Sequence, residues 1–126
     1  MCLKRKSDKL MEEAVRDLEC GCYNKAVSAA YFSVRMLAEY MMPGLRTSKD
    51  DKIANALYRK LREVVGDEKA RQVRIDFLEM FAWRKYADHR GVLFDREDAE
   101  AAVELARELM DLMVSNLGDR EEEHGT

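Results

Sequence analysis

The architecture follows from the segment Gly21-Cys22-Tyr23-Asn24-Lys25-Ala26-Val27-Ser28-Ala29-Ala30-Tyr31-Phe32. Its first residue is a glycine, which tolerates the left-handed backbone that ends many helices. Apolar side chains then recur every three or four residues, at Tyr23, Val27, Ala30, Val34, Leu37 and Met41. Small residues between them let neighbouring helices approach closely. The pattern predicts a central helix over about residues 23–42, and the short turn before it predicts an antiparallel helix hairpin.

Four further helices are predicted on either side of this one from the spacing of apolar residues. Together the five are expected over about residues 4–20, 23–42, 48–66, 67–88 and 95–117. Ser48 with Asp51 resembles a capping box that opens the third helix. Asp67 is expected to cap the fourth, and Asp95 with Asp98 the fifth. The segment 92–94 is too short for a strand, so the fold class is all-α, an up-and-down bundle of about five helices.

Composition narrows the class of protein. The chain has 126 residues, of which 47% are hydrophobic and 37% charged, so residues 1–117 are expected to form one helical domain. Residues 118–126 are acidic and are expected to be a disordered tail. The net charge of −3 disfavours a general nucleic-acid or membrane binder, so RNA contact needs a local basic cluster. Neither a signal peptide nor a membrane span is expected, and the predicted location is cytoplasmic.

Metal-binding patterns are sparse. The cysteines are Cys2, Cys20 and Cys22, and no second Cys or His pair accompanies them. A zinc site therefore has little support, and reduced thiols are the simpler interpretation. The sequence also lacks a glycine-rich phosphate loop and a paired-carboxylate metal pattern. No metal and no cofactor is expected.

The densest group of reactive side chains is Arg84-Lys-Tyr-Ala-Asp-His-Arg-Gly91. Arg84 falls on the apolar stripe of the fourth helix, where an arginine must find an anion, a partner subunit or a water-filled pocket. On an ideal helix, positions five apart differ by about 140°, so Arg84 and His89 do not share a face. They converge if the helix ends near Asp88 and turns at Gly91. They also converge where two copies meet across a two-fold axis.

These residue types suffice for metal-free RNA cleavage. A histidine exchanges protons near neutral pH, and an arginine offers a fixed fork of donors to phosphate oxygens. Arg84 and His89 are therefore the candidate catalytic pair, with Asp88 orienting His89 or raising its basicity. The candidate RNA-binding residues are Lys85, Arg90 and Arg96.

Several alternatives stay open at this stage. Arg84 could be paired with an acid of the second or fifth helix, and His89 could be a polar helix end. The other histidine, His124, lies in the acidic tail and is expected to be solvated. The aromatic residues Phe77, Phe81, Trp83 and Tyr86 have the spacing of core residues rather than a stacking platform. The acids of the fifth helix form a solvated face or attract a basic partner; they are Glu97, Asp98, Glu100, Glu104, Glu108 and Asp111.

These features together resemble the HEPN family. The segment from Gly21 to Phe32 resembles its signature, a Gly-Tyr turn before an Ala-rich helix with adjacent aromatics. The Arg84–His89 spacing, at the end of the fourth helix and before an Ala-rich fifth, is similar to the family's Arg-x4-6-His motif. The similarity spans about residues 10–117. It implies a dimerising bundle whose two motifs face each other, with Arg84 and His89 catalytic.

The resemblance also implies activities and partners. Many members are metal-independent endoribonucleases, often toxins neutralised by a small nucleotidyltransferase. The leading hypothesis is accordingly a homodimeric ribonuclease, the toxin half of a two-component system, acting on single-stranded RNA. The rival is a non-catalytic module that binds a nucleotide or partners a nucleotidyltransferase. A third possibility is a purely structural dimer.

Overall fold

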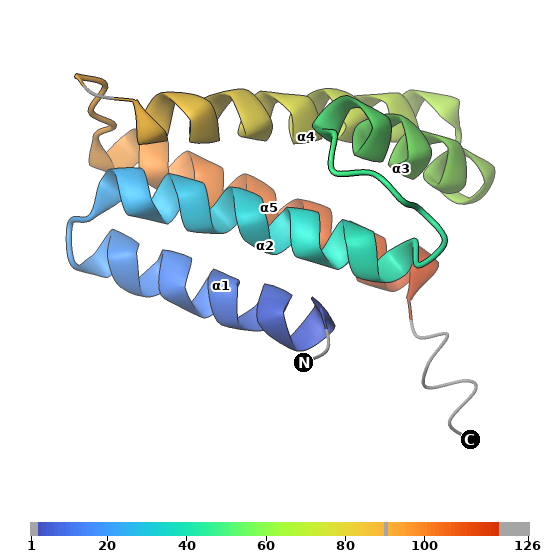
Figure 1. Ribbon diagram of the computed structural model, residues 1–126, viewed down its shortest axis with the longest axis horizontal. Coiled ribbons are helices and arrows are strands. Elements are labelled where there is room, and N and C mark those ends of the chain that lie inside the picture. Colours follow the sequence, from blue (N-terminus) through green and yellow to red (C-terminus); the bar gives the residue numbers. More distant parts are fainter. Residues whose placement is uncertain (1–2, 90, 119–126) are drawn as a thin grey trace.

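The computed structural model describes residues 3–89 and 91–118 and contains five helices in that part of the chain (Figure 1). They are α1 (Leu3–Glu19), α2 (Tyr23–Met41), α3 (Asp50–Val65), α4 (Asp67–Asp88) and α5 (Arg96–Leu117). No strand occurs in the described residues, so the all-α prediction is confirmed. Cys2, Arg90, His124 and the tail from residue 119 onward lie outside the described residues. None of the described helices is long and apolar enough to cross a membrane.

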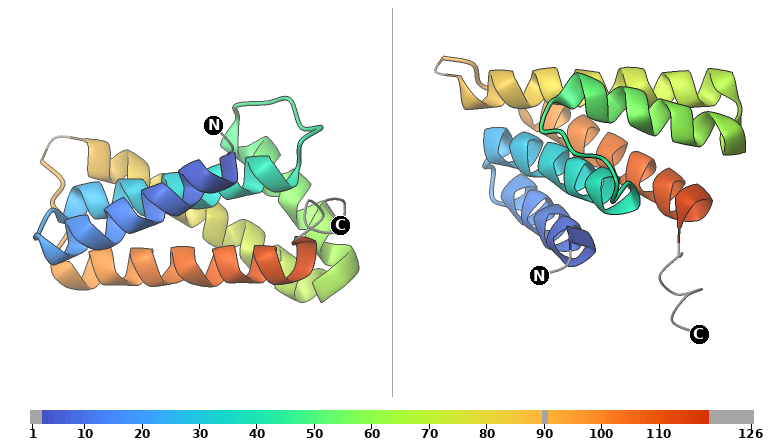
Figure 2. Two further views of the ribbon diagram at one scale, coloured as in Figure 1. Left: turned by 90° about the horizontal axis from the view of Figure 1, so that it is seen from below. Right: turned by 45° about the vertical axis from the view of Figure 1, so that its right-hand side comes forward.

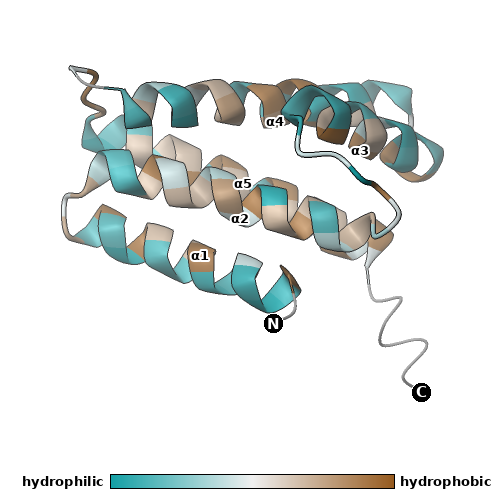
Figure 3. Cartoon of the chain, in the orientation of Figure 1, coloured by the Kyte–Doolittle hydropathy of each residue, from teal (hydrophilic) through white to brown (hydrophobic). Residues whose placement is uncertain are grey.

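Helix α2 is the centre of the bundle, as its small residues predicted. It packs against α1 on one side and against α4 and α5 on the other (Figures 1 and 2). Ala26, Ala30 and Ala38 are fully buried, which lets the neighbouring helices approach. The loop after α2 runs back along the bundle, so α3 forms a hairpin with α4 rather than with α2 (Figure 1). Brown, apolar segments lie mainly where helices face one another (Figure 3).

The α1–α2 turn has the geometry that Gly21 predicted. Gly21 has φ +80°. Its N–H donates to the carbonyl of Leu18 at 3.2 Å, and the Cys22 N–H donates to that of Asp17 at 2.8 Å. This pair of bonds is the Schellman motif, which satisfies carbonyls left free at the end of α1. The turn reverses the chain directly into α2.

One predicted helix cap is confirmed. Asp95 accepts the Asp98 N–H at 2.8 Å, and Asp98 accepts the Asp95 N–H at 3.2 Å, so a capping box opens α5. The two reciprocal bonds satisfy backbone donors that the first turn of a helix otherwise leaves free. They fix where the connection from α4 ends.

The other two caps were predicted wrongly. Helix α3 starts at Asp50 after Lys49, with no side-chain cap from Ser48. Its start is set by tertiary contacts instead, because the buried Asp50 carboxylate accepts the Tyr31 hydroxyl and pairs with Arg35 at 3.6 Å. Asp67 is the first residue of α4 rather than its cap, and its carboxylate binds the side chains of Tyr58 and Arg71.

Candidate functional site

Arg84 occupies a core-facing position of α4. The buried residues Val73, Phe77, Met80 and Ala87 follow the helical spacing of three and four, and Arg84 falls in the same register. Its side chain is 30% exposed. The guanidinium carbon lies 5.0 Å from the ring centroid of Phe32 on α2, a distance at which a cation is attracted to an aromatic face. The arginine is therefore held against α2 while one side remains open to solvent.

The aromatic rings that contact Arg84 are held in place by a buried hydrogen bond of Tyr31. Its guanidinium carbon also lies 5.9 Å from the ring centroid of Tyr31, and that ring packs edge-on against Phe32 at 5.0 Å. The hydroxyl of Tyr31 is buried and donates to Asp50. Burial, followed by the neighbouring Asp50 carboxylate, raises the pKa of Tyr31 well above its usual range. Tyr31 therefore stays neutral and holds one orientation.

Arg84 is paired with a carboxylate of its own helix. Its Nε lies 3.3 Å from Oδ2 of Asp88, one turn later. The alternative of an acid on the second or fifth helix is not what the structure shows, because the ion pair of Arg84 is with Asp88 on α4. The contact is close enough for an ion pair, but its geometry does not make a hydrogen bond, and the buried Nε has no acceptor. Arg84 therefore retains unused donor capacity.

His89 stands where α4 ends. The helix stops at Asp88, and His89 has extended backbone (φ −87°, ψ 146°) with its N–H bonded to the carbonyl of Tyr86 at 3.1 Å. Its side chain is exposed. Gly91 has φ +83°, so the helix end and the turn occur at the residues that the sequence predicted. No hydrogen bond joins Asp88 to His89 among the described contacts, and the carboxylate is paired with Arg84 instead.

Asn24 forms hydrogen bonds to the segment between α4 and α5, which includes His89. From the first turn of α2, its Nδ2 donates to the carbonyls of Ala87 at 3.0 Å and Val92 at 2.7 Å. Its Oδ1 accepts the backbone N–H of Phe94 at 2.9 Å. One side chain thus ties both ends of the turn between α4 and α5 to α2. Sequence reasoning missed this role, although an amide beside the apolar stripe of α2 was a visible signal.

A groove of about 330 Å³ lies beside these residues. It is formed by α1, α2 and the end of α4, and its lining includes the Arg84-stacked Phe32, the anchor Asn24 and the ion-paired Asp88. The remaining lining residues are Leu10, Asp17, Lys25, Ser28, Ala29 and Ala87. The exposed Lys25 adds a cation to the rim. The groove therefore borders Phe32 and Asp88, the two residues that contact Arg84.

The sequence model of the HEPN domain matches residues 2–117. The chain belongs to the HEPN family. Neither a curated protein nor a solved structure matches it significantly. Family membership supports a nuclease or nucleotide-binding module for this chain.

The basic residues that were expected to bind RNA differ in their contacts in this HEPN domain. Lys85 is exposed on α4, and its Nζ lies 5.1 Å from the ring centroid of Phe81. Arg96 opens α5 and forms an exposed ion pair with Glu100 at 3.5 Å. Arg90 lies outside the described residues. Among the described residues, no group of three or more His, Cys, Asp or Glu side chains is placed to hold a metal ion.

Proposed function

We propose that this HEPN domain is a metal-independent endoribonuclease that cleaves single-stranded RNA, with Arg84 and His89 as its catalytic pair. The observation that carries the proposal is the position and environment of the Arg84 side chain. Its guanidinium is stacked on Phe32, and its buried Nε has no hydrogen-bond acceptor. It lies five residues before an exposed histidine at the helix end. A preoriented cation whose side chain is 30% exposed is suited to a phosphate.

The reaction is an internal transfer at phosphorus. The neutral imidazole of His89 takes the proton of a ribose 2′-hydroxyl, and the 2′-oxygen forms a bond to phosphorus. The bond from phosphorus to the 5′-oxygen breaks, and that oxygen receives a proton from an imidazolium or from water. The products are a 2′,3′-cyclic phosphate and a 5′-hydroxyl. Arg84 stabilises the charge that builds on the non-bridging oxygens.

The proposed active unit is a homodimer in which two motifs face each other. His89 is exposed, and the large side chains of Tyr86 and Leu93 on either side of it are 55% and 88% exposed. Covering these side chains with a second copy would bury apolar area near the motif. Lys85, Arg90 and Arg96 are proposed to hold the RNA backbone. The biological role proposed is that of a toxin controlled by a small nucleotidyltransferase.

A second candidate function has one observation in its favour. The carboxylate of Asp88 lies 3.3 Å from the Nε of Arg84 and lowers the net charge available to a phosphate. A module that binds a nucleotide or a nucleotidyltransferase without cleavage needs no stabilisation of transition-state charge, so it tolerates such pairing better than a nuclease does. In that case nucleotide raises the melting temperature by mass action and no RNA is cut.

The deciding experiment is incubation of the purified protein with single-stranded RNA in EDTA, with the product ends identified by mass spectrometry. We expect cleavage with 2′,3′-cyclic phosphate ends. Arg84→Ala is expected to abolish it, and Arg84→Lys to lose most of it, because lysine keeps the charge but lacks the planar fork. Wild-type cleavage that Arg84→Ala does not reduce contradicts the proposal. Absence of cleavage together with a nucleotide-dependent melting shift supports the binding module.

A further inference from the structure

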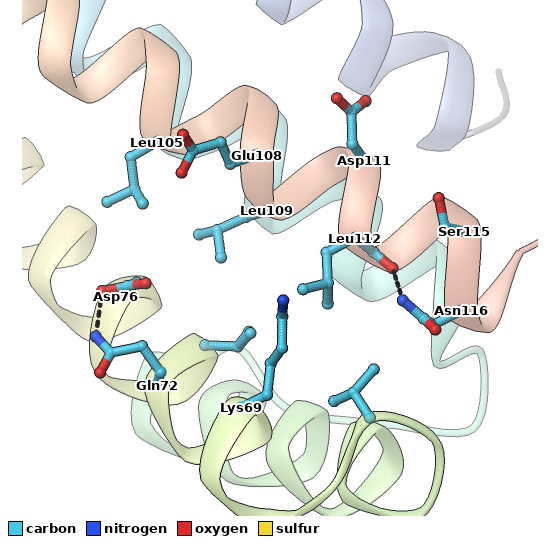
Figure 4. Close-up of a pocket in the computed structure, with 12 residues that line it drawn as sticks. Lys69, Gln72, Asp76, Leu105, Glu108, Leu109, Asp111, Leu112, Ser115 and Asn116 are labelled. Carbon is cyan, nitrogen blue, oxygen red and sulfur yellow. Dashed lines mark hydrogen bonds between the residues drawn. The ribbon is translucent and has the colours of Figure 1, made fainter.

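A second groove lies at the opposite end of α4 from His89. It has a volume of about 690 Å³ and runs between the first half of α4 and the second half of α5 (Figure 4). Its apolar lining includes Val73 of α4 and Leu105, Leu109 and Leu112 of α5. The nuclease proposal makes no use of this groove. The groove results from how the helices pack. Helix α4 packs mainly on α3 and α2 and α5 packs mainly on α2, so α4 and α5 make few contacts with each other.

The α5 side of the groove is a helix face that its neighbours cover only in part. Leu105, Glu108, Leu112 and Asn116 recur at intervals of three and four residues and all line the groove. They lie beside the face that α5 buries in the core. Leu105 and Leu112 pack against the edge of the core but are only half-buried. Leu105 and Leu112, two helical turns apart on this face, can pack against a second helix.

The rim of the groove is negatively charged. Asp76, Glu108 and Asp111 line it, against a single cation, Lys69. Lys69 is exposed on α4 and extends into the space between the helices (Figure 4). Glu108 and Asp111 form no ion pair with any described residue, and Asp76 is bonded only to Gln72, at 2.9 Å. This excess of unpaired acid repels phosphate-bearing ligands and attracts cationic ones.

We propose that this groove binds a basic amphipathic helix of a partner protein. Apolar residues of that helix would lie along Leu105 and Leu112, and its Lys or Arg side chains would pair with Glu108 and Asp111. Leu105 to Asn116 spans about 16 Å at 1.5 Å per residue, which matches about three helical turns. The inference concerns a surface separate from Arg84 and His89, so it holds whether or not that pair cleaves RNA.

The test uses the full-length protein and two fluorescein-labelled helical peptides of equal length. Both carry the same leucine stripe at positions i, i+4, i+7 and i+11. One has lysines beside the stripe and the other has glutamates. Anisotropy titrations are run with wild type and with Glu108→Gln/Asp111→Asn. The control pair Glu12→Gln/Glu13→Gln makes the same charge change at exposed residues of α1. A third variant, Leu105→Ala, removes apolar contact without a charge change.

The lysine peptide is expected to bind wild type and the α1 control equally. The Glu108→Gln/Asp111→Asn protein should bind it about tenfold more weakly, because two surface ion pairs are lost. Leu105→Ala should also weaken it, and the glutamate peptide should not bind. Absence of binding overturns the proposal, as does equal binding of both peptides or equal weakening by the α1 control. If the groove substitutions instead dissociate a homo-oligomer without peptide, a second copy fills the groove and the proposal is also overturned.

Discussion

The Nε of Arg84 lies 3.3 Å from Oδ2 of Asp88, so the carboxylate next to His89 in the chain is paired with the arginine. The two proposed catalytic residues therefore do not share a common carboxylate partner. Arg84 is stacked on Phe32 and partly neutralised, while His89 stands exposed at the end of α4. This arrangement makes Asp88 a competitor of the RNA phosphate for Arg84.

Replacing Asp88 with asparagine should therefore strengthen RNA binding. An ion pair of this one-turn spacing is worth about 0.3–0.5 kcal/mol, so Asp88→Asn is expected to lower the Kd for a 2′-O-methyl RNA oligomer by about twofold. That ligand lacks the attacking hydroxyl, so binding is measured without cleavage. Cleavage of ordinary RNA should persist.

The matched control is Asp8→Asn. Asp8 forms an ion pair of the same spacing with Lys4 at 3.5 Å, and its side chain is 54% exposed against 51% for Asp88. It should leave RNA affinity close to that of wild type. Loss of cleavage in Asp88→Asn, to the level seen without His89, would instead mean that Asp88 acts on the histidine.

Asn24 should be required to position the turn that carries His89. Asn24→Asp keeps the acceptor for Phe94 but removes both donors to the carbonyls of Ala87 and Val92. We expect the free energy of unfolding in urea to fall by about 2 kcal/mol, because buried acceptors lose their donors. RNA cleavage should fall by more than the folded fraction does.

The control for that variant is Asn116→Asp. The amide of Asn116 donates to the carbonyl of Leu112 at 2.8 Å within α5, so its loss should cost about 0.5 kcal/mol and leave cleavage intact. Equal effects of the two substitutions on cleavage would show that Asn24 has no positioning role.

Gly91→Ala should destabilise the domain through its backbone alone. Gly91 has φ +83°, and a Cβ there would meet no atom within 4 Å. The left-handed conformation costs an alanine about 1–2 kcal/mol. Gly44 also has open space around it but lacks the positive φ, so Gly44→Ala should change stability by less than about 0.5 kcal/mol. Thermal melts that shift equally for both variants would refute this account of the turn.

Tyr31 should make stability depend on pH in the alkaline range. Its folded pKa is raised above the ordinary value of 10.0, mainly by burial. The stabilising effect is thus complete below pH 10 and is lost as pH rises, since the unfolded chain releases the proton first. Between pH 9 and 11, wild type should lose about 1.4 kcal/mol more than Tyr31→Phe. The other four tyrosines are common to both proteins, and parallel pH profiles would contradict the prediction.

The helices could be predicted because their signals are local. Apolar spacing located all five, Gly21 located the first turn, and Asp95 with Asp98 located the start of α5. The start of α3 could not be found in this way. Asp50 is bound by Tyr31 from another helix, and such a contact overrides the local cap that Ser48 offered.

The sequence predicted where the residues of the candidate site lie along α4, but it did not predict their side-chain contacts. The register of α4 identified Arg84 as core-facing, and Gly91 indicated the turn after His89. The pairing of Arg84 with Asp88 and the three bonds of Asn24 depend on side-chain placement and on partners up to 70 residues apart in the chain. The spacing of four between Arg84 and Asp88 is a local signal that the sequence offers. The bonds of Asn24 have no such signal, so only the folded structure reveals them.

The decisive comparison is the initial rate of single-stranded RNA cleavage in EDTA by wild type, His89→Ala and His124→Ala. His124 is the only other histidine of the chain and serves as the control. Wild type and His124→Ala are expected to cut at the same rate. His89→Ala should be slower by at least about 100-fold, the usual loss for a general acid or base, with an unchanged melting temperature. Cleavage by His89→Ala at the wild-type rate would contradict the proposed role of the imidazole.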